Sequence, residues 1–184
     1  LETSSYEKID RQIATNLTGL IDVTRAFLPG MREAGRGVFV NITSVGGATT
    51  FPFFSLYHAT KWAVEGLTES LRYELGFFGL QAKIVEPAGV HTDFGSRSLD
   101  ASGDGSTDVY TEKVVKMMTG ARARQDNYST PDQTADVIFG AATDRTTRLR
   151  YIAGADAEAM LAARASMPFE DYSEALVAQL GLPD

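Results

Sequence analysis

The sequence predicts an α/β fold, in which helices cover both faces of a parallel β-sheet. Three observations support this prediction. Stretches with helical periodicity alternate with short β-branched or aliphatic runs at 38–43, 82–87 and 148–154. The chain has 184 residues, of which 43% are hydrophobic, so it is large enough to bury one core. It contains no internal repeat, and we therefore expect residues 1–184 to form a single domain.

The chain begins with a pattern that predicts a long helix over residues 4–33. Ser4 or Ser5 can cap its first turn. Apolar side chains recur along it at helical spacing: Ile9, Ile13, Leu17, Leu20, Phe27, Leu28 and Met31. After two glycines, the run "VFVNIT" at 38–43 is typical of a buried strand.

A loop and a second long helix follow the first strand. The segment "SVGGATTFPFF" at 44–54 is rich in Gly and Thr and then aromatic, which predicts a loop. Residues 55–78 predict a helix whose apolar face carries Ala59, Ala63, Leu67, Leu71 and Leu75. The second strand, "AKIVEP" at 82–87, ends at a proline.

The remaining chain predicts mostly helices. The segment "DFGSRSLDASGDGSTD" at 93–108 indicates a mobile loop or lid and not a domain linker, because regular patterns resume after it. We expect this loop to shape a substrate pocket. The expected elements beyond it are helices at 109–125 and 131–143, a strand at 148–154, and helices at 155–166 and 169–180. Three short strands make a thin sheet with an exposed edge, so the pattern favours part of a larger fold.

Composition excludes several classes of function. The chain contains no cysteine, which rules out disulfides and thiolate metal sites and suits the reducing cytoplasm. Two histidines without clustered ligands make a metal site improbable. The net charge of −7 argues against nucleic acid as the main partner. No apolar run approaches the length of a membrane span, so we expect no membrane partner.

Tyr57 and Lys61 carry the first chemical signal, because residues four apart share one face of a helix. A free phenol has a pKa of about 10, which is too high for efficient proton transfer at neutral pH. A neighbouring ammonium favours the phenolate and lowers that pKa. The pair can thus act as a general acid/base for interconverting an alcohol and a carbonyl. Alternatively, Tyr57 packs in the core and the Lys61 side chain extends to water.

Other residues favour the chemical interpretation. Ser44 directly follows the first strand, at the position where open α/β sheets build their sites. Asn16 lies inside the first helix, where asparagine has poor propensity; local hydrogen bonding, simple tolerance and a functional use all explain it equally. The segment "EPAGVHTDF" at 86–94 leaves the second strand and can present backbone N–H groups and a hydroxyl to a ligand.

Four motifs together resemble the short-chain dehydrogenase/reductases. They are "NLTG" at 16–19, "NITS" at 41–44, "YHATK" at 57–61 and "EPAGVHT" at 86–92, with the order and spacing of that family. The resemblance runs from about residue 5 to about residue 155. It implies a Rossmann-like fold, and the three strands correspond to strands 5, 6 and 7 of the family's sheet. Ala88 stands where the family usually has glycine.

The resemblance implies a role for each matching residue. Tyr57 is the proton donor or acceptor at the substrate oxygen, Lys61 lowers its pKa and binds the nicotinamide ribose, and Ser44 polarises the substrate oxygen. Asn16 holds a water that links Lys61 to solvent. The residues expected to line the nicotinamide are Pro87, Ala88, Gly89, Val90 and Thr92. The implied function is an oxidoreductase that transfers hydride between NAD or NADP and a small alcohol or ketone.

One family feature is missing from these residues. The Gly-rich cofactor fingerprint, T-G-x-x-x-G-x-G, occurs nowhere in the 184 residues, and the chain begins without Met. We therefore expect the natural protein to extend upstream of Leu1. The alternative is a dehydrogenase-like module that binds or assembles without catalysis. The family also implies a homodimer or homotetramer through helices 4–33 and 55–78. Four aromatic side chains fit either that interface or the core: Trp62, Tyr73, Phe77 and Phe78.

Overall fold

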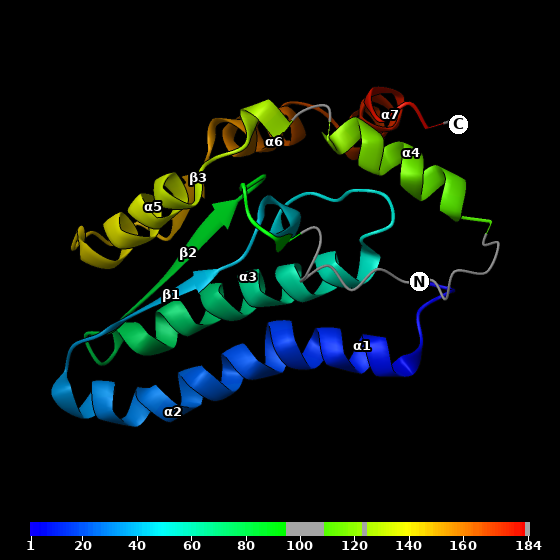
Figure 1. The fold of residues 1–184 in the computed structure, drawn as a ribbon. Helices are drawn as coiled ribbons and strands as arrows, with labels where there is room; N and C mark the ends of the chain where they lie inside the picture. Colours follow the sequence, from blue (N-terminus) through cyan, green and yellow to red (C-terminus); the bar gives the residue numbers. More distant parts are fainter. Residues whose placement is uncertain (95–108, 123–124, 183–184) are drawn as a thin grey trace.

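The computed structural model describes residues 1–94, 109–122 and 125–182, and it has a three-stranded sheet with helices around it (Figure 1). The predicted loop at 93–108 lies outside the described residues, apart from Asp93 and Phe94. The elements are α1 (Tyr6–Ile13), α2 (Gly19–Ala34), β1 (Val38–Ile42), α3 (Ser55–Gly76), β2 (Gln81–Pro87), α4 (Thr111–Arg122), α5 (Pro131–Thr143), β3 (Arg150–Ala153), α6 (Ala155–Ser166) and α7 (Phe169–Gln179).

The sheet has the order β1-β2-β3, and both pairs are parallel, as the sequence predicts. Val38 pairs with Gln81 and Ile84 pairs with Arg150, so neighbouring strands run in register towards one edge. Because their carboxyl ends meet there, the segments that follow β1 and β2 are brought together.

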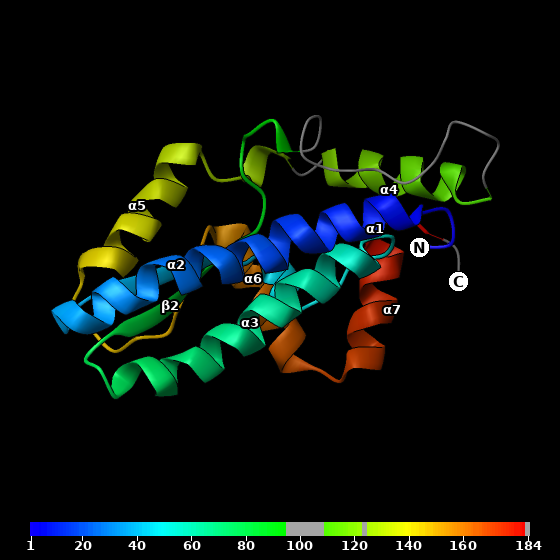
Figure 2. The same cartoon turned by 90° about the horizontal axis from the view of Figure 1, so that it is seen from below.

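Two apolar layers hold the helices on opposite faces of the sheet. On one face, α2 and α3 pack on β1 and β2 around Phe39, Leu75 and Leu80. On the other, α5 packs around Val85 and Tyr151, which are buried among its aliphatic side chains. The views in Figures 1 and 2 show α2 and α3 side by side beneath the sheet. The predicted Rossmann-like α/β arrangement is therefore confirmed for the described part of the chain.

The first predicted helix, 4–33, is not a uniform α-helix. A short π-helical segment, Ala14–Thr18, separates α1 from α2. The extra backbone residue in such a turn reorients the side chains beside it, and π segments occur often at functional sites. Asn16 lies within it, and its side-chain amide donates to the Thr60 hydroxyl on α3 at 3.1 Å. The irregular turn thus joins the first helix to α3.

The aromatic side chains of the second helix do not lie in the core of the described chain. Tyr73 and Phe77 are 75% and 83% exposed, and Trp62 and Phe78 are about half exposed. Of their two predicted locations, the core is therefore excluded. Among the described helices, none combines the length and apolar character needed to span a bilayer.

A buried amide–hydroxyl pair generates a prediction about stability. The Asn41 side-chain amide on β1 donates to the Thr68 hydroxyl on α3 at 2.8 Å, and that hydroxyl donates to the Val64 carbonyl. The Thr68→Val substitution keeps the shape but leaves the buried Asn41 N–H without this acceptor. We expect the free energy of unfolding, measured in urea, to fall by about 1–3 kcal/mol.

Thr143 supplies a matched control. Its hydroxyl also donates to the carbonyl four residues earlier, at Phe139, but it is exposed and bonds no buried amide. Thr143→Val should change stability by less than about 0.5 kcal/mol. Equal losses in the two variants would contradict the role assigned to the Asn41–Thr68 pair.

Candidate active site

Ser44, Tyr57 and Lys61 meet at the carboxyl ends of β1 and β2. Ser44 follows β1 and caps the short turn Val45–Gly47, where its hydroxyl accepts from the Gly46 N–H at 3.1 Å. Tyr57 and Lys61 project from the first turns of α3. All three line one cleft of about 1570 Å³. The structure therefore brings together the three residues that the sequence singles out for proton transfer.

The Tyr57 phenol lies in a largely apolar part of the cleft. Its ring contacts Phe54, His58 and Phe94 edge-on. Burial raises the pKa of Tyr57, and a hydrogen bond with Ser44 opposes that rise. The net direction is upward, whereas the sequence predicts a lowered pKa through Lys61. The loss of solvation is the larger effect, and the predicted contribution of Lys61 stays a prediction.

The Lys61 ammonium connects α3 to the end of the first strand. Its Nζ donates to the Ile42 carbonyl at 3.1 Å and lies 5.7 Å from the centre of the Tyr57 ring. Burial lowers the pKa of Lys61, and the negative charge of Glu65 opposes that effect. Burial thus acts against the charged form of both members of the pair.

Asn16 reaches this centre only indirectly. It is absent from the described lining of the cleft, and its amide bonds Thr60, whose hydroxyl donates to the Tyr57 carbonyl at 2.7 Å. Its contacts therefore support the backbone of α3 at Tyr57. Its predicted role in holding a water near Lys61 stays a prediction.

The segment after β2 lines the opposite side of the cleft, with all five of its predicted residues: Pro87, Ala88, Gly89, Val90 and Thr92. The Gly89 N–H is already engaged, because it donates to the Asp156 carboxylate at 2.9 Å. A β-carbon on Gly89 would lie 2.1 Å from the Tyr128 ring, so only glycine fits there. Contacts within the protein therefore fix the shape of this segment.

Sequence reasoning missed the residues that hold this segment. Ser129 pairs with Val90 in an isolated parallel bridge: its N–H donates to the Gly89 carbonyl, and its carbonyl accepts from the His91 N–H. Asp156 holds Gly89 from the start of α6. The only sequence signal for Asp156 was an acidic residue in the first turn of the helix after the third strand. Acidic residues are common at helix starts, so this signal does not single it out.

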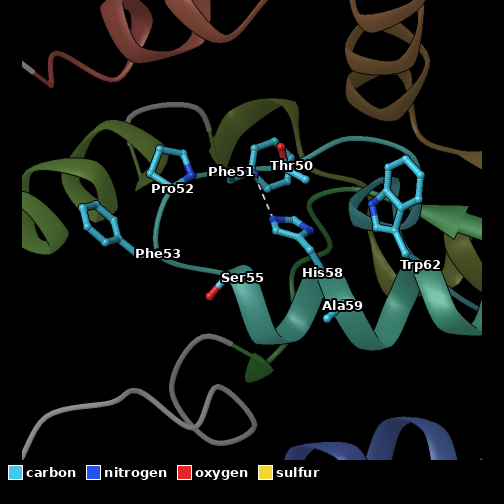
Figure 3. A pocket seen from close by; sticks show the side chains of 8 residues that line it. All are labelled: Thr50, Phe51, Pro52, Phe53, Ser55, His58, Ala59 and Trp62. Carbon is cyan, nitrogen blue, oxygen red and sulfur yellow. Dashed lines mark hydrogen bonds between the residues drawn. The ribbon is translucent and has the colours of Figure 1, made fainter. Parts of the chain in front are cut away.

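A shallower hollow of about 550 Å³ lies beside the cleft (Figure 3). Its lining is Thr50, Phe51, Pro52, Phe53, Ser55, His58, Ala59 and Trp62. The His58 ring points from α3 towards the segment at 50–53 (Figure 3), where its Nε2 accepts from the Phe51 N–H at 2.8 Å. Its Nδ1–H donates to the Gly46 carbonyl, so both ring nitrogens are used. His58 therefore fastens the loop to the helix, and it does not face a reacting atom.

The far wall of the cleft is apolar and comes from α4, α6 and α7. Its side chains include Met117, Met118, Met160, Met167, Tyr172, Leu176 and Leu180. Of the described residues that line the whole cleft, only Lys61 and Asp156 belong to the Asp, Glu, Lys and Arg group. The described cleft thus combines one polar end at the strands with an uncharged, methionine-rich end.

Comparisons with known proteins agree with this geometry. A family model described as short chain dehydrogenase matches residues 1–102. The uncharacterized oxidoreductase YusZ of Bacillus subtilis is 31% identical over 98% of this chain and 65% of its own length. A short-chain dehydrogenase from Streptomyces avermitilis superimposes with a TM-score of 0.73 at 31% identity, covering 97% of this chain and 62% of that one.

A 3-oxoacyl-[acyl-carrier protein] reductase from Brucella melitensis, solved with bound NAD, has a TM-score of 0.60 at 26% identity. It matches 82% of this chain and 53% of its own. The chain spans less than two thirds of the length of each of these three proteins. The family model covers more than half of the chain and contains Ser44, Tyr57 and Lys61, so the chain belongs to the short-chain dehydrogenase family.

Proposed function

We propose that this chain carries the acid/base centre of an NAD(P)-dependent oxidoreductase that interconverts an alcohol and a carbonyl. The observation that supports the proposal most strongly is the convergence of Ser44, Tyr57 and Lys61 on one cleft at the strand ends. A phenol beside a hydroxyl and an ammonium has the groups that a carbonyl oxygen needs when it gains or loses a proton.

Each residue has a distinct task in this proposal. The Tyr57 hydroxyl donates its proton to the substrate oxygen during reduction and takes it back during oxidation. The Ser44 hydroxyl bonds the same oxygen and stabilises the phenolate that remains on Tyr57. The Lys61 ammonium, held on the Ile42 carbonyl, contributes positive charge beside the phenol.

The residues in the cleft fit the nicotinamide end of the cofactor. Lys61 supplies a donor for a ribose hydroxyl, and Pro87, Ala88, Val90 and Thr92 form the wall beside it. When bound, the cofactor supplies or accepts the hydride. The 184 residues contain no Gly-rich phosphate loop and no selector for the adenosine ribose, so the proposal covers NAD and NADP equally.

The far wall favours a substrate with an apolar body. Methionine side chains adapt to irregular apolar shapes, and four of them lie among the lining residues of the cleft. The described wall formed by α4, α6 and α7 offers no Lys or Arg that would bind a phosphate or a carboxylate. We therefore propose a fairly hydrophobic alcohol or ketone as the substrate.

The exposed aromatic side chains on α3 favour a homo-oligomer. Tyr73 on this helix, Phe77 directly after it, and Phe27 on the neighbouring α2 are more than half exposed. Large exposed apolar groups that gather on adjacent helices mark interaction surfaces. We propose a homodimer or homotetramer through these helices, in the cytoplasm, where a chain without cysteine is at no disadvantage.

Replacing Tyr57 by Phe removes the proposed proton donor and keeps the ring that packs on Phe54 and Phe94. With an apolar ketone and NADH or NADPH, we expect kcat/KM to fall by about 10²- to 10⁴-fold while the thermal unfolding midpoint stays close to wild type. Steady-state assays and circular dichroism measure the two effects.

Tyr73→Phe is the matched control, because Tyr73 lies on the same helix outside the described lining of the cleft, and Phe keeps the exposed ring proposed for the oligomer interface. Its activity should equal that of the wild type. If Tyr57→Phe also keeps wild-type turnover, the proposed acid/base role is wrong. If the wild-type protein shows neither turnover nor nicotinamide binding, the non-catalytic module becomes the better description.

The Ser44→Ala substitution generates a pH-dependence with a defined sign. Ser44 stabilises the phenolate, so its loss raises the pKa of Tyr57 further. Alcohol oxidation needs the phenolate, and its kcat/KM should therefore rise with pH along a limb that lies at higher pH in the variant. Ketone reduction needs the protonated phenol, so its falling limb should also move to higher pH.

Ser55→Ala is the control for this experiment, since Ser55 is exposed at the start of α3 and lies outside the described lining of the cleft. Its pH profile should match that of the wild type. A Ser44→Ala variant that loses activity equally at every pH would show that Ser44 does not act on the Tyr57 proton.

A further inference from the structure

Two carboxylates are buried directly behind the acid/base centre. Glu65 on α3 and Glu86 on β2 have side chains only 8% and 2% exposed. Arg150 on β3 lies between them, with its Nη2 2.9 Å from Glu65 Oε2 and its Nε 3.9 Å from Glu86 Oε1. The cluster therefore joins a helix and two strands with one cation for two acids.

This arrangement is electrostatically costly. Burial and the nearby Glu65 charge raise the pKa of Glu86 to about 7, although Arg150 opposes the shift. Glu65 Oε1 is buried and has no hydrogen-bond partner among the described residues. A buried carboxylate with an unsatisfied oxygen weakens a fold more than an apolar side chain of the same size would. The ion pair with Arg150 uses Glu65 Oε2 and does not account for the buried, unsatisfied Oε1.

Glu65 has two direct links to the acid/base centre. It lies one helical turn beyond Lys61, and its negative charge raises the pKa of Lys61 against the effect of burial. Its side chain also packs on the turn that begins at Ser44: a β-carbon on Gly47 would lie 2.8 Å from Glu65 Cγ. The Glu65 side chain thus acts on Lys61 through its charge and packs against the turn that carries Ser44.

We propose that Glu65 is a positioning residue of the acid/base centre, which acts on Lys61 one helical turn away and supports the Ser44 turn. The inference rests on the proposed function in one respect, the part that Lys61 plays in proton transfer. The charged groups that face Glu65 are Lys61 and Glu69 on α3, Glu86 on β2 and Arg150 on β3. The turn Val45–Gly47 contributes none.

The competing explanation is that Glu65 only anchors Arg150. A comparison with Glu69, which also binds Arg150, distinguishes this explanation from the proposal. Glu69 also binds the Arg150 guanidinium, but it is half exposed and lies a further turn away from Lys61. Glu65→Gln and Glu69→Gln each remove one acidic partner of Arg150. Only Glu65→Gln removes the charge next to Lys61.

The test follows the ionisation of Lys61 itself, by NMR of the chain with ¹³Cε-labelled lysine. The five lysines give five resonances, and Lys61→Met assigns the one of interest. We expect Lys61 to titrate at lower pH in Glu65→Gln than in the wild type. Glu69→Gln should leave its midpoint close to wild type, and Glu65→Asp, which retains the charge, should restore most of the shift.

A second variant, in which the Lys61 midpoint should shift in the opposite direction, distinguishes the electrostatic effect from a loss of structure. Arg150→Met leaves the Glu65 charge uncompensated in the alkaline range where lysine titrates, so the Lys61 midpoint should move to higher pH. Local unfolding would remove the burial of Lys61, so its titration midpoint would rise towards that of an ordinary lysine in both variants. Equal midpoints in wild type and Glu65→Gln, or shifts of the same sign in Glu65→Gln and Arg150→Met, would overturn the proposal.

Kinetics then separate this inference from the proposed function. In the active protein, Glu65→Gln should lose activity at alkaline pH, where its Lys61 is neutral, and keep more of it near neutral pH. If Tyr57→Phe abolishes turnover but the Glu65→Gln profile has wild-type shape, the inference fails while the proposed function stands. If Tyr57→Phe is fully active, the proposed function fails, and the Lys61 titration still decides the electrostatic role of Glu65.

Discussion

Helix α3 lies against the parallel strands β1 and β2, and the hydrogen bond from Lys61 to the Ile42 carbonyl joins it to the end of β1. The positions of Ser44, Tyr57 and Lys61 depend on this packing. The helix begins near the carboxyl ends of the strands, so its first two turns place Tyr57 and Lys61 in the cleft. The same strand end leads into the turn that carries Ser44. Parallel strands thus bring together residues that lie far apart in the sequence.

Burial and specific partners act in opposite directions on the reactive pair. Loss of solvation raises the pKa of Tyr57 and lowers that of Lys61, so it favours the neutral form of each group. Ser44 opposes the effect on the phenol, and Glu65 opposes it on the ammonium. Each member of the pair therefore has one neighbour that favours its charged form: Ser44 for the Tyr57 phenol and Glu65 for the Lys61 ammonium.

The sequence predicted the parts of this structure that depend on local pattern. The strand runs and the i, i+4 spacing of Tyr57 and Lys61 follow from periodicity, and the structure confirms the parallel strands. The predicted apolar face of the second helix is wrong in part: of its five residues only Leu75 is buried, whereas Val64 and Thr68 are buried instead. The net direction of the Tyr57 pKa shift could not be predicted from the sequence, because it depends on how deeply the folded chain buries the phenol. The contacts of Glu65 with Arg150 and of Gly89 with Asp156 join residues 85 and 67 positions apart, and no local pattern reveals them.

The central claim is that Tyr57 and Lys61 form one electrostatic unit, and NMR of the chain with ¹³Cζ-labelled tyrosine tests it most directly. Tyr57→Phe assigns its resonance among the seven tyrosines. Tyr57 should titrate at higher pH than an ordinary phenol, and higher still in Lys61→Met, because removing a nearby cation disfavours the phenolate. A Tyr57 that titrates like an ordinary phenol, and does not respond to the loss of Lys61, would contradict the account.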